Sequence, residues 1–205
     1  MIMARGYSYV VRRDYGFAPN PFYGFLTLAT CKPKIRKKAQ VGDFIIGIAP
    51  VDFDNKLVFM AKVSKVITFN EYWNNEEYAC KKPVMNGSFK KLYGDNIYHQ
   101  LENGEWMQAN SHHSNQGGNI NLTNLKRDTG TTDHVLIANE FFYFGQSMIN
   151  VPAEYVAHIR IKREHRNVDI EICNGLWNYL CVNYEMGLID LPRQFKEFIR
   201  YDGKS

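Results

Sequence analysis

The side chains best suited to chemistry are grouped near the N-terminus, in residues 12–21 (RRDYGFAPNP). Consecutive strand residues face opposite sides, so one arginine could enter a pocket while the other pairs with an acid such as Asp14. Arg12 and Arg13 are predicted phosphate ligands, because a guanidinium group binds phosphate through two hydrogen bonds. Tyr15 and Phe17 are predicted to stack on a base. The alternative is a tight structural loop whose arginine is salt-bridged.

A second group is the basic run CKPKIRKK at residues 31–38, with five positive charges in its last seven residues. Within it, Lys32, Lys34 and Arg36 are predicted to contact phosphate. Such contacts are independent of base sequence and weaken with salt. Pro33 is expected to prevent a helix through its own position. The alternative is a solubilising loop.

The sequence offers few candidates for proton transfer, and it does not identify the catalytic residues. His112 and His113 lie in a polar stretch and titrate near neutrality, so they are weak candidates for a base or a phosphate partner, together with Asp14. Trp106 is a further candidate for base stacking. No metal site and no cofactor are expected, because no cysteines or histidines have zinc-finger spacing and the phosphate-loop, dinucleotide and hydrolase motifs are missing.

The charge of the chain is unevenly distributed. Residues 1–41 hold eight basic side chains and one acid, which gives +7, whereas the other 164 residues hold 17 basic and 20 acidic side chains, which gives −3. The total of +4 in 205 residues is too small to identify a nucleic-acid binder. The asymmetry favours a local anion-binding face on the N-terminal part.

These residues require a scaffold, and the patterning predicts an α+β fold. With 45% hydrophobic and 14% aromatic residues, the chain is expected to form a single domain, 1–205. Its β-rich part is residues 1–150, interrupted by a long polar insertion at 81–133, and its helical C-terminal layer is residues 153–205. The elements expected are strands at 6–13, 25–29, 44–48, 57–67, 97–101, 106–110 and 134–138, and helices at 70–80, from Ala153, from Val168 and from Pro192.

The chain lacks a signal peptide pattern and a long apolar run, so a cytoplasmic protein with no membrane partner is expected. Its four scattered cysteines are interpreted as reduced thiols. The oligomeric state stays open.

Several of these segments resemble a known family. The motifs RRDYGFAPNPF and TCKPKIR, the turn VGDFIIG and the later segment HVLIANEFFYFG are similar to the nucleotide modification associated domain 2 family, from Tyr7 to about Pro152. The resemblance implies a bacterial or phage protein linked to DNA base hypermodification, and it supplies no catalytic residues. A weaker likeness at residues 41–66, to the PUA, EVE and ASCH barrels that bind modified bases or RNA, implies a PUA-like mixed β-barrel.

The leading hypothesis is a protein that binds a nucleotide or nucleic acid, DNA rather than RNA, in the setting of DNA base modification. One alternative is an enzyme that acts on a nucleotide or modified base. Another is a partner subunit of a modification or defence complex that docks through its C-terminal helices.

Overall fold

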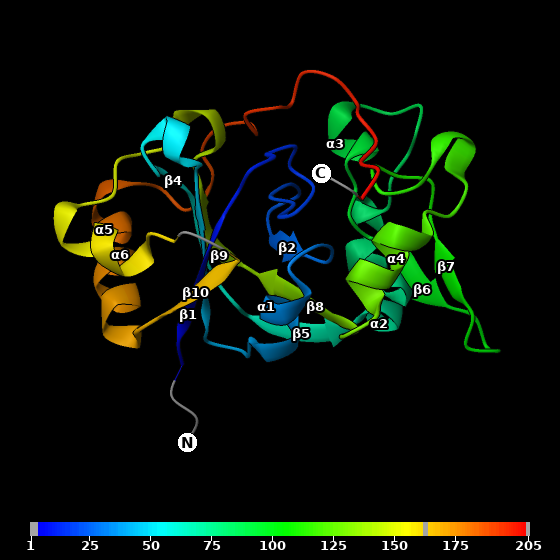
Figure 1. The fold of residues 1–205 in the computed structure, drawn as a ribbon, viewed down its shortest axis with the longest axis horizontal. Coiled ribbons are helices and arrows are strands. Elements are labelled where there is room, and N and C mark those ends of the chain that lie inside the picture. Colours follow the sequence, from blue (N-terminus) through cyan, green and yellow to red (C-terminus); the bar gives the residue numbers. More distant parts are fainter. Residues whose placement is uncertain (1–3, 162–163, 204–205) are drawn as a thin grey trace.

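A computed structural model, which describes residues 4–161 and 164–203, shows a mixed α+β fold (Figure 1). The strands are β1 (Gly6–Val10), β2 (Leu26–Leu28), β3 (Phe44–Ile48), β4 (Leu57–Lys62), β5 (Lys65–Thr68), β6 (Tyr98–Gln100), β7 (Trp106–Gln108), β8 (His134–Ala138), β9 (Glu140–Tyr143), β10 (His165–Val168) and β11 (Gly187–Leu188). The α-helices are α1 (Pro33–Lys38), α2 (Phe69–Asn74), α3 (Phe89–Leu92), α4 (Leu122–Thr129), α5 (Ala153–Ile159) and α6 (Ile170–Asn183). Short 3₁₀ helices are η1 (Val51–Phe53), η2 (Glu76–Lys81), η3 (Gln116–Gly118) and η4 (Gly145–Ser147).

The strands form three sheets. The main sheet has the order β10-β1-β3-β4-β9-β11, in which β1 runs parallel to β3 and β9 parallel to β11, while the other neighbours are antiparallel. A second, antiparallel sheet has the order β2-β8-β5, and β6 pairs with β7. The α+β class is therefore confirmed. Among the described residues no strand pairing joins the main sheet to the second sheet, so the expected barrel does not form a closed ladder.

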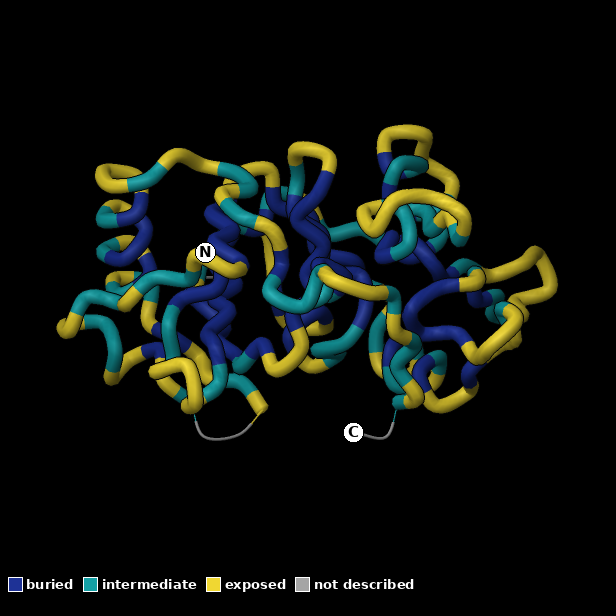
Figure 2. The backbone as a smooth tube through the Cα atoms, turned by 90° about the horizontal axis from the view of Figure 1, so that it is seen from above, coloured by how far each residue is buried: buried dark blue, intermediate teal, exposed yellow. Residues whose placement is uncertain are grey.

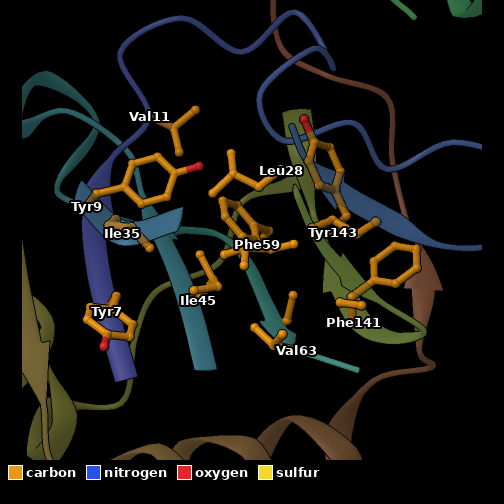
Figure 3. Close-up of a cluster of buried hydrophobic side chains, with 14 of the residues drawn as sticks. Tyr7, Tyr9, Val11, Leu28, Ile35, Ile45, Phe59, Val63, Phe141 and Tyr143 are labelled. Carbon is orange, nitrogen blue, oxygen red and sulfur yellow. The ribbon is translucent and has the colours of Figure 1, made fainter. Parts of the chain in front are cut away.

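The first core fills the space between the main sheet and the second sheet. Alternate side chains of a strand face opposite sides, and on β1 Tyr7 and Tyr9 face this core. Ile45 and Phe59 add to it from β3 and β4, and Leu28 packs on them from β2 (Figure 3). Strands β3 and β4 are buried almost throughout, whereas the exposed residues lie mainly in the connecting loops (Figure 2). Strand β1, whose end carries the site described below, is paired with β3 on one side and β10 on the other.

A second core lies on the opposite face of the main sheet. There Ile46 and Met60 pack against Leu176 and Leu180 of α6, and α5 covers the same side (Figure 1). The helices α5 and α6 therefore cover one face of the main sheet. The strand β10 nevertheless lies between α5 and α6 in the sequence and pairs with β1.

The helix expected from Pro192 is not formed. The described residues after 191 contain turns and extended chain that cross the molecule toward α3 and α4 (Figure 1). Asp14 holds the start of this segment, since its carboxylate accepts from the backbone N–H of Arg193 at 2.9 Å and its carbonyl accepts from that of Gln194 at 2.8 Å. These N–H groups are bound to the loop after β1.

Residues 81–133 are folded rather than a structureless loop. They contain α3, β6, β7 and α4, which confirms the two short strands expected there. Tyr93, Ile97 and Tyr98 of this segment share a third core with Phe69 and Val135. The N-cap of α2 is Thr68, which forms a capping box with Glu71, so the helix begins one residue before the predicted start at residue 70.

Candidate functional site

A pocket of about 370 Å³ opens where β1 ends and meets the segment before α1. Its cationic lining consists of Arg12, Arg13, Lys32 and Arg127, and its aromatic lining of Tyr9, Tyr15, Phe17 and Tyr201. Cys31, His112 and His113 complete its polar wall. Seven of the predicted site residues thus meet in one place: Arg12, Arg13, Tyr15, Phe17, Lys32, His112 and His113.

The backbone of this wall is strained at two consecutive residues. Cys31 and Lys32 have φ angles of 56° and 42°, in the left-handed region that side-chain-bearing residues adopt only at a cost. Directly afterwards α1 begins at Pro33, which is tolerated in the first turn because its missing N–H is not needed there. A helix therefore begins at Pro33 but does not run through this position from the residues before it.

The cations of the pocket lie against aromatic rings. The guanidinium carbons of Arg13 and Arg127 are 4.8 and 5.1 Å from the centre of the Tyr201 ring. Lys32 Nζ is 4.5 Å from the centre of the Tyr9 ring, and burial, with the nearby Arg12 charge, lowers the pKa of Lys32 despite the opposing effect of Cys31. Such contacts stabilise a desolvated cation. They place positive charge on the wall of the pocket.

Three polar side chains form a chain of contacts at the base of the pocket. Cys31 Sγ lies 3.9 Å from His113 Nε2, and His113 Nδ1 lies 2.8 Å from Asp128 Oδ2. His113 and Asp128 are buried, and Cys31 is half-buried. The loop after β7, the helix α4 and the segment after β2 supply one residue each.

Asp128 is held as a carboxylate by the groups around it. Arg127 Nε and Nη2 donate to its two oxygens at 2.9 and 3.1 Å, Tyr98 Oη donates at 3.0 Å and the Cys31 backbone N–H donates at 2.9 Å. Burial opposes ionisation of Asp128, but His113 and Arg127 outweigh it and place its pKa far below the usual range. Burial lowers the pKa of His113, but the negative charges of Asp128 and Cys31 outweigh burial and raise it.

His112 differs from its neighbour. Burial, together with the positive charge at His113, lowers the pKa of His112 to about 3, so its ring is neutral near pH 7. Its Nδ1 donates to the carbonyl of Ile199, and the Tyr201 backbone N–H donates to the carbonyl of His112 at 2.7 Å. His112 therefore anchors the C-terminal segment beside the pocket.

Four predicted residues lie elsewhere. Arg36 is fully buried, and its guanidinium donates to the carbonyls of Cys31, His134 and Asp128. Lys34 is exposed and pairs with Glu164 at 2.8 Å. Neither lines the pocket, because helical periodicity turns Lys34 outward and Arg36 into the core.

The other two belong to the scaffold around the site. Asp14 is buried, accepts from the Tyr143 hydroxyl and holds the C-terminal segment, and burial raises its pKa. Trp106 packs edge-on against Phe69 with ring centres 5.7 Å apart, away from the pocket lining.

Sequence reasoning missed four residues of the site: Cys31, Arg127, Asp128 and Tyr201. Cys31 lies within the basic run of residues 31–38. The four cysteines are scattered along the chain, so their spacing did not single out Cys31. Asp128 is 97 residues away from Cys31 in the chain, and nothing in the local sequence marks it.

The potential ligand atoms of Cys31, His113 and Asp128 all lie within 4.8 Å of one another, so a metal ion is a conceivable occupant. The donor set argues against it. Asp128 already accepts from five N–H or O–H groups, two of them on Arg127. The positive charge of Arg127 would also oppose a cation at this point.

Comparison with known proteins gives one result. The model of the family described as nucleotide modification associated domain 2 matches residues 3–198. No curated protein and no solved structure gives a significant match. Within the described residues, none of the helices has both the length and the apolar character that a membrane crossing requires.

Proposed function

The chain belongs to the nucleotide modification associated domain 2 family, and from this premise we propose that its pocket binds a nucleotide. The observation that supports the proposal is the convergence of cationic and aromatic side chains on one cavity of about 370 Å³. Pockets for small organic ligands typically have volumes of about 300–1,000 Å³. The size therefore suits a mononucleotide, or one nucleotide at a strand end or displaced from a duplex.

In this proposal the phosphate contacts Arg12, Arg13 and Lys32. Arginines suit this role because their planar groups match phosphate oxygens in pairs. Tyr15 offers a ring for the base and is itself stacked on Tyr93, with ring centres 5.4 Å apart and planes at 13°. Phe17 is buried against His113, at 4.5 Å between ring centres, so it supports the wall of the pocket.

The same proposal includes the type of nucleic acid, the biological system and the cellular compartment. The family resemblance favours DNA over RNA and a bacterial or phage base-modification system in the cytoplasm. The two facing sheets bury one core between them, which supports the likeness to PUA-like barrels even without a closed ladder. Lys34 lies two residues beyond the pocket-lining Lys32, so its proposed phosphate contact is confined to ligands longer than one nucleotide.

Calorimetric titration with deoxynucleoside monophosphates and with short single-stranded DNA tests the proposal. The variant Arg13→Gln should bind a mononucleotide at least tenfold more weakly, whereas the matched control Lys37→Gln, on the exposed side of α1, should bind normally. Affinity should fall steeply as salt rises. Lys34→Gln should weaken only the binding of DNA. Absence of binding to both ligand classes at low salt would overturn the proposal.

A further inference from the structure

We propose that Cys31 is the nucleophile of a covalent step on the ligand of this pocket, with His113 as its proton acceptor and Asp128 as the residue that positions the imidazole. The inference rests on the proposed nucleotide site and adds a chemical reaction to it. The ligand class is a nucleotide that carries an electrophilic carbon with a leaving group, for example an ester or amide carbon.

The order of contacts carries the argument. A carboxylate only accepts hydrogen bonds, so the 2.8 Å contact with Asp128 places a proton on His113 Nδ1. The other ring nitrogen, Nε2, is thereby directed at Cys31 Sγ, 3.9 Å away. In this arrangement an acid orients a base, and the base contacts a nucleophile. The same arrangement activates cysteine and serine nucleophiles on unrelated folds.

The charges favour the thiolate. Burial alone would raise the pKa of Cys31, but the positive charge and hydrogen bond of His113 outweigh burial and lower it. Asp128 and the thiolate in turn raise the pKa of His113. A thiolate next to an imidazolium is the reactive form of a cysteine. By contrast, Cys173 is buried in the second core, where burial raises its pKa to about 12.

Access and strain agree with this role. Cys31 lines the same cavity as Arg13 and Lys32, so a phosphate held there places the rest of the ligand near the sulfur. Its left-handed φ of 56° is costly for a residue with a side chain. Buried Arg36 stabilises this conformation, because its Nε donates to the Cys31 carbonyl at 2.8 Å.

The step balances with water as the co-reactant. The thiolate attacks the carbon, the Sγ–C bond forms, and the bond to the leaving group breaks. The leaving group departs with the electron pair and the proton from His113 Nε2. Water then gives a proton to Nε2 and adds its oxygen to the same carbon, and the breaking Sγ–C bond returns its electron pair to Cys31.

Alkylation of the purified protein tests the nucleophile. Iodoacetate forms an Sγ–CH₂ bond with loss of iodide, and mass spectrometry of peptides resolves each cysteine. At pH 6, Cys31 should react at least tenfold faster than Cys80 and Cys181, which serve as internal references. Iodoacetate should be favoured over neutral iodoacetamide at Cys31 alone, because the pocket is cationic. In His113→Gln the rate at Cys31 should fall at least tenfold at pH 6 and recover at high pH.

Far-ultraviolet circular dichroism and the unfolding midpoint establish whether His113→Gln is folded. If it is not, the pH profile of the wild type decides, since a Cys31 rate that stays level down to pH 6 requires a thiolate there. A Cys31 rate no greater than that of Cys181, or stoichiometric metal bound through Cys31, would overturn the inference while nucleotide binding could still stand. Fast alkylation of Cys31 without any nucleotide binding would support Cys31 as a nucleophile and overturn the proposed ligand.

Discussion

His113 Nδ1 and Asp128 Oδ2 lie 2.8 Å apart with both side chains buried, although 15 residues separate them in the chain. The contact joins the loop after β7 to the last turn of α4, and it fixes which nitrogen of His113 faces Cys31. One ion pair therefore serves two purposes, since it holds the 81–133 segment together and orients the polar wall of the pocket.

Replacing Asp128 by Asn should destabilise the fold strongly. The amide leaves Arg127 and His113 without the charge that compensates them in a buried place, and such a loss typically costs about 3–5 kcal/mol. Urea denaturation measures the change. The control Asp133→Asn, at an exposed carboxylate five residues later, should change the free energy of unfolding by less than about 0.5 kcal/mol. Equal stability of the two variants would contradict the role given to Asp128.

Arg36→Lys should also destabilise the protein despite the retained charge. The guanidinium donates to three backbone carbonyls, of Cys31, His134 and Asp128, and a single ammonium group cannot reach all three. Each lost hydrogen bond from a charged group costs about 1.5–3 kcal/mol. Thermal unfolding beside the exposed control Lys37→Gln measures the difference. A variant with wild-type stability would show that the buried arginine is dispensable.

Stability should fall in acid partly through His112. Its pKa is about 3 in the folded protein against a usual value near 6.5, so between these values the unfolded chain binds a proton that the folded one does not. The stabilising contribution of the neutral ring is therefore complete above pH 6.5 and is lost as pH falls toward 3. His112→Gln should show a shallower decline in unfolding free energy over this range. If the unfolding free energy of both proteins declined equally over this pH range, groups other than His112 would cause the acid sensitivity.

Tyr201→Ala should weaken nucleotide binding more than Tyr201→Phe. The ring lies against Arg13 and Arg127, so its removal releases two cations that it helps to place. We expect a loss of about 0.5–2 kcal/mol in binding free energy for Ala and much less for Phe, by titration calorimetry. Equal losses for Phe and Ala would mean that the hydroxyl, rather than the ring, matters.

Much of the fold could be predicted from the sequence because it depends on local pattern. Apolar runs predicted β3, β4 and β8, and the short runs around Ile97 and Trp106 predicted β6 and β7. The order of the predicted elements, with strands before residue 150 and helices after residue 153, predicted the α+β class. The helix expected from Pro192 was wrong, because the N–H groups of Ile199 and Tyr201 donate to the Tyr93 hydroxyl and the His112 carbonyl, 106 and 89 residues earlier, rather than to helical carbonyls.

For the site, the sequence by itself determined that positive charge and aromatic rings are concentrated at residues 12–17 and 31–38, since neighbours in the chain stay neighbours in space. Only the tertiary structure decided which of these cations reach a common pocket. Within one short helix it turned Arg36 into the core and Lys34 into solvent. It alone brought Cys31 to His113, 82 residues away, and to Asp128, because long-range packing sets such distances and leaves no periodic trace in the sequence.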